Sequence, residues 1–537
     1  MSTFYLRTES IKPEDILDLS VMNESDLNIL SSLLSPEPCL LEGSRGTGKS
    51  FLMRVAELNL ERDQPKSIPV YVSFNISSLI DTDDHLQFYH WMLAKSLKAL
   101  INKLRKNGLV VSKHSSNLLS NDEREREDEI ENDLKKIVKD FENSYRGASN
   151  VDTDLLPDIE DVKDAIQLIC EENGLDRIYF FFDEAAHVFR PEQQRQFFSL
   201  YKDLRSHFIT CNAAIYPGVT YFGDSFEPLH DCIFKKLERN IKDSDYLTYF
   251  QAIVYNQADD KLKVTIDQNK SLFNTLALGC GGNPRMLLKT IQDLPKFRTN
   301  EVNSLIKDFY RGKIWTEHTE LGEKYKGHQK LIDWGRDFLE NEVLSAINKY
   351  NESRKEKDLN ETSVYFWIHK DSPETVKESL RLLTYTGIIR KIDSSIRATR
   401  SELGSRYEVK FGCIIALQAN PSNEAIAFFN ALSVKKFPEF GKNHSAYRAI
   451  SDLKKEMKSE ENFKESLANM MSKPISVLQL LTHWQKEKLN EAGIETLRDL
   501  HNKTESELIE KIYNVGPARA RIIKNAANAE LLEYLSG

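Results

Sequence analysis

The sequence predicts an α/β core built on a parallel sheet, followed by smaller domains that are mainly helical. In residues 1–240, short apolar runs rich in β-branched and aromatic residues alternate with segments of helical spacing. A glycine-rich loop joins the first apolar run to the first helical segment. From about residue 243 onward, apolar residues recur mostly at helical spacing. A chain of 537 residues is long enough for several such domains.

The core is expected to span residues 1–240. Its predicted strands and helices follow from the apolar pattern: strands at residues 39–42, 68–74, 177–182 and 208–216, and helices at residues 50–60 and 85–104. A charged insertion at about residues 105–155 carries the run DEREREDEIENDLKK within residues 121–142. We expect an exposed helix or a mobile segment there, with a solvated role rather than a binding role.

The glycine-rich loop GSRGTGKS, residues 43–50, is a complete Gly-x-x-x-x-Gly-Lys-Ser pattern between an apolar run and a helix. Its glycines let backbone N–H groups face phosphate oxygens at a helix N-terminus. Lys49 is expected to neutralise the β- and γ-phosphates, and Ser50 to ligate Mg²⁺. The loop therefore predicts ATP and Mg²⁺ as cofactors, and the alternative is a glycine-rich turn. The expected nucleotide contacts are Gly43, Gly46, Thr47, Gly48, Lys49 and Ser50.

Two acids follow the apolar run IYFFF directly, at Asp183 and Glu184. Carboxylates at the tip of a buried strand are unfavourable unless they meet a cation or hydrogen-bond donors. We expect Asp183 to hold Mg²⁺ through water and Glu184 to polarise the attacking water. The alternative is a strand-end turn with two surface acids. Asn212 and Thr220 are candidates for sensing the γ-phosphate, with core or turn roles equally open.

The segment GCGGNPRMLL, residues 279–288, places Arg285 in the first turn of a helix after glycines and a proline. On a helical lid at residues 241–325, this arginine is expected to fold over the phosphates and to report hydrolysis as lid movement. The alternative is an arginine on a helix surface. Arg285 thus joins the expected cofactor-binding and catalytic residues.

Together, these motifs resemble the AAA+ and STAND superfamily of P-loop ATPases, and the replication-initiator (origin-recognition) type in particular. The glycine-rich loop, the acid pair and the GNPR motif at residues 282–285 occur in the order that this type shows. The resemblance implies that Lys49, Glu184 and Arg285 are the catalytic residues, with Arg285 as the lid arginine called sensor 2.

The sequence departs from the superfamily at the arginine finger, which oligomeric members usually carry shortly after the third strand. Residues 223–238 contain no arginine, and Arg239 follows in a strand-like setting. Lys235 and Lys236 are weaker substitutes because an ammonium lacks the planar fork of a guanidinium. The departure therefore argues against hydrolysis across a subunit interface, and a slow ATP-dependent switch and a faster motor both stay open.

Residues 326–420 resemble a winged helix, a fold often appended to initiator-type ATPases. Ser372 is expected to cap a helix that ends at Gly387, and a β-hairpin is expected at residues 388–392 and 406–411. Arg397 and Arg400 of the hairpin are expected to contact a DNA backbone. A merely soluble hairpin and a protein-binding winged helix are the alternatives.

The tail consists of a helical linker at residues 421–473 and a compact helical domain at residues 474–537. This domain resembles the tandem helix-hairpin-helix module that ends bacterial RNA polymerase α subunits. Asn514 stands where the family more often has glycine, and asparagine also tolerates the left-handed conformation of the turn. The residues expected at DNA phosphates are Gly516, Arg519, Arg521 and Lys524. The alternative is a protein-docking module.

The net charge, the cysteine spacing and the apolar runs argue against several classes of protein. A net charge of −9 means that any DNA contact needs a local basic patch. The six cysteines are scattered with no CxxC pair, which argues against a zinc site and a disulfide framework. The sequence shows no signal peptide and no apolar run long enough to span a bilayer. We therefore expect a cytoplasmic protein without membrane contact.

The predicted fold class is an α/β P-loop ATPase core with a helical lid, followed by winged-helix and all-α helix-hairpin-helix domains. The leading hypothesis is an ATP-binding and ATP-hydrolysing DNA-binding switch that acts in DNA transactions or in defence against mobile elements and phage. One alternative is a STAND-type signalling scaffold whose terminal modules bind protein, and another is a DNA translocase. The expected partners are DNA and a protein partner or effector, and a homo-oligomer stays open.

Overall fold

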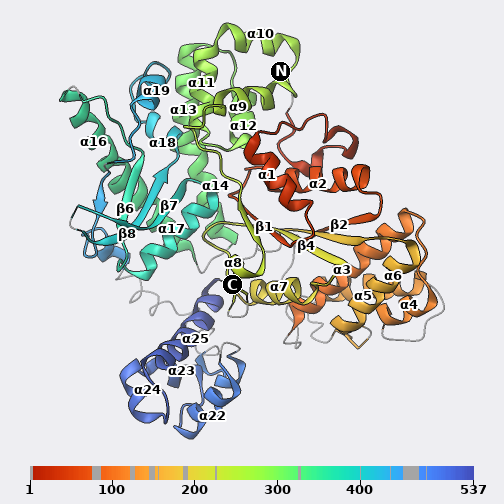
Figure 1. Ribbon diagram of the computed structural model, residues 1–537. Helices are drawn as coiled ribbons and strands as arrows, with labels where there is room; N and C mark the ends of the chain where they lie inside the picture. The colour runs from red at the N-terminus through yellow and green to blue at the C-terminus, as the bar shows by residue number, and fades with distance from the viewer. Residues whose placement is uncertain are drawn as a thin grey trace.

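The computed structural model places the N-terminal core beside a second, smaller sheet, with a separate helical unit at the C-terminal end (Figure 1). The described residues are 4–74, 86–120, 127–143, 151–154, 156–184, 191–223, 226–324, 328–357, 359–399, 401–435, 437–450, 471–478 and 481–536.

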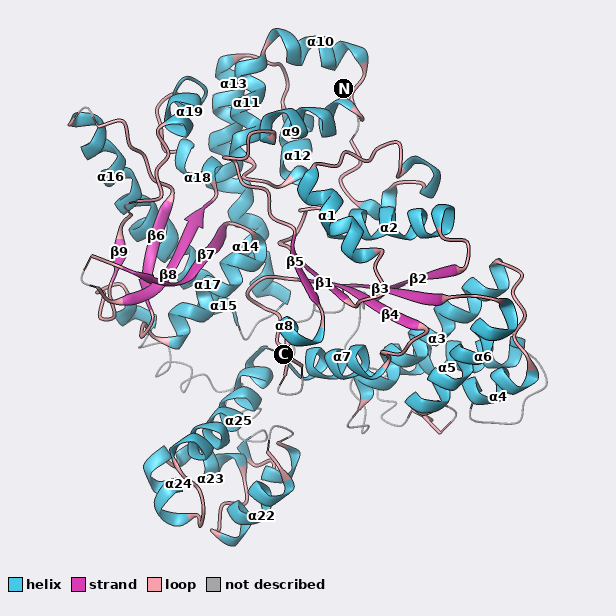
Figure 2. Cartoon of the chain, viewed as in Figure 1, coloured by secondary structure: helices cyan, strands magenta, loops and turns pink. Residues whose placement is uncertain are grey.

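The core is a five-stranded parallel sheet in the order β2-β3-β4-β1-β5 (Figure 2). Its strands are β1 (Cys39–Glu42), β2 (Ser67–Ser73), β3 (Arg177–Asp183), β4 (Ile209–Ile215) and β5 (Ile233–Lys236). The first four confirm the strands expected from the apolar runs, whereas β5 is a short edge strand that the pattern did not predict. Because all five strands run the same way, the loops after β1, β3 and β4 meet at one edge.

Alternate side chains of the strands build two apolar cores, one on each face of the sheet. Phe180 and Phe182 of β3 pack with α3 (Gln87–Lys106), α6 (Ile159–Asn173) and α7 (Pro191–Asp203). Tyr179 and Phe181 pack on the other face with α1 (Glu24–Leu33) and α2 (Lys49–Asp63). Burial on both faces explains why the strands are continuous apolar runs rather than alternating ones.

The charged insertion is packed more closely than we expected. α5 (Glu127–Asn143) lies against α3, and Leu134, Ile137 and Phe141 are at most 4% exposed. These residues recur at helical spacing and form one apolar face, so the charged residues cover only the rest of the helix. The expectation of a wholly exposed helix is therefore wrong for residues 127–143, while residues 121–126 lie outside the described part. α4 (Lys113–Ser120) packs on α6.

Residues 243–324 are mainly helical, as the spacing of their apolar residues predicted. The elements are α9 (Tyr246–Tyr255), α10 (Asp260–Gln268), α11 (Lys270–Gly279), α12 (Pro284–Asp293), α13 (Thr299–Asp308), the π-helical turn η4 (Phe309–Lys313) and α14 (Ile314–Lys324). We call this part the lid. Short elements also occur in the core, at η1 (Thr8–Ser10), η2 (Pro13–Asp15) and α8 (Pro228–Asp231).

A second sheet organises residues 328–450, which we call the second-sheet unit. Its strand order is β7-β8-β6-β9, and β7 and β8 form an antiparallel hairpin. The elements are α15 (Gln329–Asp337), η6 (Phe338–Val343), α16 (Leu344–Glu356), β6 (Tyr365–His369), α17 (Glu374–Thr386), β7 (Ile389–Arg397), β8 (Leu403–Val409), α18 (Phe411–Ile415), α19 (Pro421–Asn430) and β9 (Glu439–Phe440).

Two local predictions for this unit are wrong. The N-cap position of α17 is Pro373, so Ser372 lies one residue outside the helix, and its buried hydroxyl has no hydrogen-bond partner among the described residues. Residues 439–440 form β9, which pairs with β6, although the segment after residue 420 was expected to be a helical linker. The helix end at Gly387 is confirmed, because this residue caps α17 with a φ of 74°.

The lid and the second-sheet unit share one apolar core. Phe250 and Leu287 of the lid and Phe366 and Ile414 of the second-sheet unit belong to the same buried cluster. The two cores of the α/β sheet are separate clusters. The lid and the second-sheet unit therefore form one packed body, which meets the core across a smaller apolar contact that includes Tyr216 and Tyr385.

The C-terminal unit is helical and has its own small core. It consists of η7 (Ile475–Val477), α22 (His483–Glu491), α23 (Leu497–Asn502), α24 (Glu505–Lys511) and α25 (Pro517–Ser536). Asn514 has a φ of 61°, which confirms the left-handed turn expected there. Ala520 and Ile523 are fully buried, as expected for the small packing residue and the core contact that follow the second hairpin. No helix in the described part of the chain is long and apolar enough to cross a membrane.

Candidate nucleotide-binding site

The glycine-rich loop lies between β1 and α2, at the edge of the sheet where the strands end. Gly46 and Gly48 have φ angles of 82° and 101°, in the left-handed region that favours glycine. A Cβ on Gly46 would also lie 2.8 Å from Oδ1 of Asn283 in the lid. Gly48 is the N-cap residue of α2, so the free N–H groups of the first helical turn adjoin the loop. This arrangement suits a phosphate.

Lys49 is buried beneath the loop. Its Nζ donates to the carbonyl of Gly43 and, at 3.2 Å, to that of Ser44. The same Nζ lies 3.8 Å from the centroid of the Tyr216 ring, which follows β4. Burial lowers the pKa of Lys49 to about 7, against the raising effect of Asp183. A bound phosphate would favour the ammonium form and raise this pKa again.

The two acids lie where β3 ends. Asp183 is 4% exposed and accepts hydrogen bonds from the Tyr71 hydroxyl and, at 2.9 Å, from the N–H of Glu184. Glu184 has a φ of 59°, a strained value for this residue type, and accepts from the Ser73 hydroxyl at 3.5 Å. Burial, and then the negative charge of Asp183, raise the pKa of Glu184.

These acids and Ser50 offer only oxygen ligands, which fits Mg²⁺. The position of Glu184 supports the fit, because this partly buried carboxylate directly follows Asp183 and shares a cavity with Ser50, so that a cation there would offset both the burial and the repulsion that raise its pKa. Ser50 lines the cavity in front of the loop together with Glu184 and Ser73. Among the described residues, no group of three or more His, Cys, Asp or Glu side chains could hold a metal ion.

The lid contacts the loop through the first turn of α12. Asn283 is the N-cap residue of this helix, and its Nδ2 donates to the carbonyl of Arg45 at 2.7 Å. The N–H of Arg285 donates to the carbonyl of Gly46 at 3.4 Å. The Arg285 guanidinium donates to the carbonyl of Leu6 at 2.9 Å. Arg285 therefore lines a cavity of about 580 Å³ with the glycine-rich loop and the N-terminal segment.

Arg239, the arginine nearest to the expected finger position, is buried inside the chain and lies beyond the end of β5. Its Nη1 donates to the carbonyl of Thr47 and its Nη2 to Asp26 of α1, both at 2.8 Å. Tyr249 of the lid helix α9 donates to the same carboxylate at 2.6 Å. Arg239 therefore links the loop, α1 and the lid, and only 9% of it is exposed.

The second-sheet unit contacts the loop from the opposite side. Helix α17 ends at Gly387, where an added Cβ would lie 2.9 Å from the Ser44 hydroxyl oxygen. Arg381 of α17 donates to the carbonyl of Gly218, just after β4. The rings of Tyr385 and Tyr216 meet edge to face, with centroids 5.1 Å apart. Tyr216 therefore touches both Lys49 and α17.

Residues 3–219 match the model of the ORC-CDC6-like family. The match covers the core as far as the turn after β4 and confirms the predicted resemblance for that part of the chain. Among solved structures, the Orc1 protein of Aeropyrum pernix in complex with DNA is similar at 12% identity, over 78% of this chain and 95% of that chain, with a TM-score of 0.29. No curated protein matches the chain.

Within the part of the core that the family model matches, Asn212, one of the two candidate sensors of γ-phosphate, has structural contacts. Asn212 is fully buried, where its Oδ1 accepts from the N–H of Cys39 and its Nδ2 donates to the carbonyl of Leu33. Thr220 closes a turn by donating to the carbonyl of Tyr216 at 2.7 Å. Neither residue lines the nucleotide cavity, whereas Tyr216 does. Sequence reasoning missed Tyr216, whose only signal was an aromatic residue at the end of a buried strand.

The DNA contacts expected in the hairpin lie outside the ORC-CDC6-like match. Arg397 is exposed, and its Nη1 donates to the carbonyl of Ser401 at 2.8 Å. Arg400 lies outside the described residues. Arg390 and Arg406 are paired with Glu408 and Asp393 of the same hairpin. The contact expected for Arg397 stays a prediction.

In the C-terminal unit, two of the three basic residues expected at DNA phosphates form hydrogen bonds within the unit. Gly516 and Arg521 are exposed, as a phosphate contact requires. Arg519 donates to the carbonyl of Asn514 at 2.6 Å and lies over the ring of Trp484. Lys524 donates to the carbonyls of Leu500 and His501 at 3.2 and 2.8 Å, so a phosphate contact would require these bonds to break. Gly516, Arg519 and Arg521 are therefore at the surface, whereas Lys524 is partly buried.

Proposed function

We propose that this protein is an ATP-binding and ATP-hydrolysing switch that binds DNA and acts in DNA transactions or in defence against mobile elements and phage. One observation carries the proposal. The lid and the second-sheet unit share one apolar core, and both contact the glycine-rich loop. A change at the loop therefore acts on a single body that includes the basic hairpin. The ORC-CDC6-like match of the core supports the nucleotide part of the proposal.

The nucleotide phosphates would lie in the glycine-rich loop against the first turn of α2. Lys49 would leave the carbonyls of Gly43 and Ser44 to meet the phosphate oxygens. Ser50 and Asp183 would hold Mg²⁺, which supplies positive charge that stabilises the phosphates during hydrolysis. Glu184 would orient and deprotonate the attacking water, a role that its raised pKa favours.

Arginines of the same chain surround these phosphates. Arg45 in the loop and Arg285 in the lid both line the cavity, and the charge of each lowers the pKa of Lys49 after the effect of burial. Their positions support hydrolysis within one chain, without an arginine from a neighbouring subunit. Guanidinium groups placed in this way stabilise the charge that develops on the transferred phosphoryl group.

The switch step follows from the contacts of Tyr216. When Lys49 turns to phosphate, it leaves the face of the Tyr216 ring, whose edge packs against Tyr385 of α17. Arg285 binds the same phosphates from the lid. Both changes alter the junction between the core and the body formed by the lid and the second-sheet unit. ATP is therefore expected to shift the position of that body.

The proposal is tested by DNA affinity in defined nucleotide states. The variant Glu184→Gln should bind ATP without turning it over, and fluorescence anisotropy should report the affinity for a mixed-sequence duplex. A coupling free energy of about 1–3 kcal/mol corresponds to roughly a 5- to 150-fold change in DNA affinity with ATP. Lys49→Ala, which removes the phosphate contact, should show no such change. Equal affinity with ATP, with ADP and without nucleotide would refute the switch.

A second candidate is a signalling scaffold whose C-terminal unit binds protein. The internal hydrogen bonds of Arg519 and Lys524 favour it, because they reduce the cationic surface left for DNA. Replacing Arg521 with Gln should weaken duplex binding in the DNA-binding case and leave it unchanged in the scaffold case. Lys511→Gln, an exposed lysine on α24, is the matched control.

A further inference from the structure

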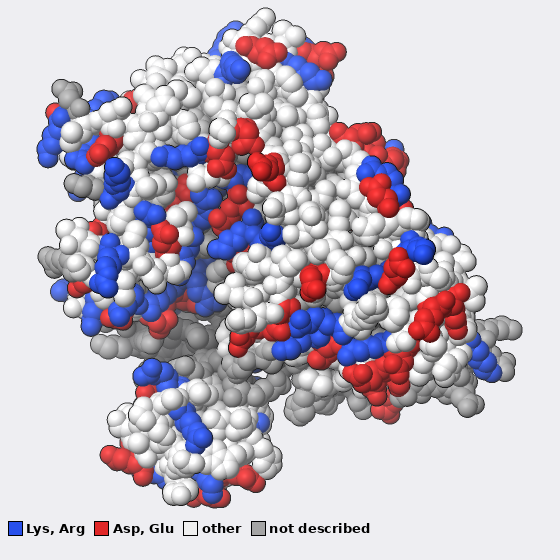
Figure 3. Space-filling model, viewed as in Figure 1, with Lys and Arg blue, Asp and Glu red and all other residues white. Residues whose placement is uncertain are grey.

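A second cavity lies behind the glycine-rich loop, between the core, the lid and the second-sheet unit. Its volume is about 650 Å³, and its walls come from β5, from the lid turn at residues 281–282 and from α17, β7 and β8. Thr47 and Arg239 line both this cavity and the nucleotide cavity, so the loop is the wall between them. Figure 3 shows Lys and Arg side chains gathered around this hollow.

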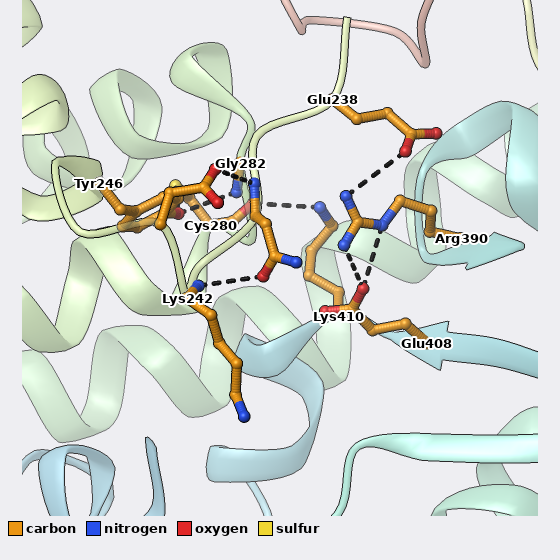
Figure 4. Close-up of polar contacts among 10 residues, drawn as sticks. Glu238, Lys242, Tyr246, Cys280, Gly282, Arg390, Glu408 and Lys410 are labelled. Atoms are coloured by element: carbon orange, nitrogen blue, oxygen red, sulfur yellow. Dashed lines mark hydrogen bonds and ion pairs between the residues drawn. The ribbon is translucent and has the colours of Figure 1, made fainter. Parts of the chain in front are cut away.

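The lining of the hollow is positive although the chain as a whole carries a net charge of −9. Eight Lys and Arg side chains line it, against four Glu side chains. Two of these acids, Glu238 and Glu408, are used by Arg390, which lies between them (Figure 4). Lys410 is also engaged, because its Nζ donates to the carbonyl of Cys280 at 3.1 Å.

The remaining lysines form what we call the cationic hollow: Lys236 of β5, Lys370 after β6, Lys377 of α17 and Lys391 of β7. Lys391 has no ion pair or side-chain hydrogen bond within the described part of the chain. Lys236 has only a contact of 3.9 Å with Glu42, and Lys377 pairs with Glu374, which is 82% exposed. Exposed or long ion pairs of this kind contribute little to stability, so little is lost when a lysine leaves one for another anion.

Lys236, Lys377 and Lys391 line the same cavity from three separate elements. Burial lowers the pKa of Lys391, and the positive charges of Lys236 and Lys377 lower it further. The fold thus holds three ammonium groups together with little internal compensation. An anion from outside the chain would remove this repulsion.

We propose that the cationic hollow binds backbone phosphates of DNA. The inference rests on the proposed function, because it names a contact surface for the same DNA. Ammonium groups are compact point charges that meet phosphate oxygens without reading base edges. The cavity of about 650 Å³ has the volume of a small-ligand site. It therefore admits a few backbone phosphates from one strand of a DNA duplex, and the duplex as a whole stays outside it. DNA seated there touches the core and the second-sheet unit at once.

The test neutralises the lysines in the full chain. The triple variant Lys236→Gln, Lys377→Gln and Lys391→Gln is compared with the wild type by anisotropy on a mixed-sequence duplex, between about 50 and about 200 mM salt with ATP trapped. Each phosphate contact that a variant removes should flatten the slope of log affinity against log salt by about 0.9. The triple variant should therefore have a slope that is flatter by nearly three units.

A matched control removes the same charge elsewhere. Lys261, Lys270 and Lys296 are exposed on the lid side of the molecule, and their triple change to Gln should leave the slope near the wild-type value. Changing Lys236, Lys377 and Lys391 to Arg, which keeps the charge, should also retain the slope. If the Gln triple unfolds, the single variant Lys391→Gln should still flatten the slope by about 0.9.

Two results overturn the inference, and they differ in what else they refute. In the first result, the wild type binds DNA, but the Gln triple of the hollow has the wild-type salt slope, or the Gln triple of the hollow and that of the lid flatten the slope equally. The hollow then does not hold phosphates, and the proposed function survives. If the wild type binds no DNA with ATP trapped, both the hollow and the proposed function fail.

Discussion

ATP binding is expected to weaken as the pH rises above neutrality, because Lys49 must be charged to hold the phosphates. Burial lowers the pKa of this residue to about 7, so its ammonium loses its proton in the nucleotide-free protein as the pH rises through that value. Glu42 and Asp183 oppose the shift and Arg45 and Arg285 add to it. If only the charged form binds, the apparent Kd scales with 1 + 10^(pH − pKa). Well above neutrality, each pH unit then approaches a tenfold loss, or about 1.4 kcal/mol.

Titration calorimetry with ATP between about pH 7.5 and about pH 9, in buffers of different ionisation enthalpy, measures this linkage. The phosphate's own ionisation, near pH 6, is complete in that range. Close to one proton should be taken up per ATP bound at the upper end. Arg45→Gln removes one like charge, which raises the pKa of Lys49 and moves the onset of weakening to higher pH. A Kd that does not change with pH, with no proton uptake, would show that the reasoning about Lys49 is wrong.

Three further outcomes follow from the site. Glu184→Gln should slow ATP turnover by roughly 10²- to 10⁴-fold and leave the Kd for ATP unchanged. Glu61→Gln, at the exposed end of α2, is the control and should keep turnover near the wild-type rate. A colorimetric assay of released phosphate measures both rates. Asp26→Ala should lower the free energy of unfolding by about 3–5 kcal/mol, because it leaves the buried charge of Arg239 without its ion-pair partner. Adding Arg239→Met should recover much of this loss in urea melts. Additive losses in the double variant would contradict the reasoning. Tyr385→Leu should shrink the effect of ATP on DNA affinity without changing the Kd for ATP, and an undiminished effect would exclude this ring contact from the coupling.

Much of the core could be predicted because its signals are local and strong. The strand β3 has five consecutive apolar residues that are buried on both faces, and the loop at residues 43–50 needs its glycines for left-handed backbone. The strands β5 and β9 have four and two residues and lie at sheet edges. Such short edge strands carry little apolar pattern, so their pairing is set by contacts far away in the sequence.

The position of a candidate site residue was predictable where a local motif fixes the backbone. It was less predictable where the side chain contacts residues far away in the sequence. Arg285 reaches the loop because the N-cap residue Asn283 fixes the start of α12, which the motif itself encodes. Asn212 is a polar residue in β4, shortly before Tyr216 in the sequence. Its side chain nevertheless donates to the carbonyl of Leu33, a contact that no local sequence pattern reveals. Lys524 lies in a basic cluster, but its direction depends on the carbonyls of another helix. A charge in the sequence does not show which partner it meets.

The most direct test of the central claim is the distance between the core and the second-sheet unit in defined nucleotide states. Nitroxide labels at Leu27 of α1 and Ser395 of β7, both exposed, would report it by double electron–electron resonance, after Cys232 is changed to Ser because the other cysteines are buried. In the Glu184→Gln background, ATP should shift the distance distribution relative to the nucleotide-free protein, and adding Arg285→Ala should abolish the shift. Identical distributions with ATP, with ADP and without nucleotide would contradict the account.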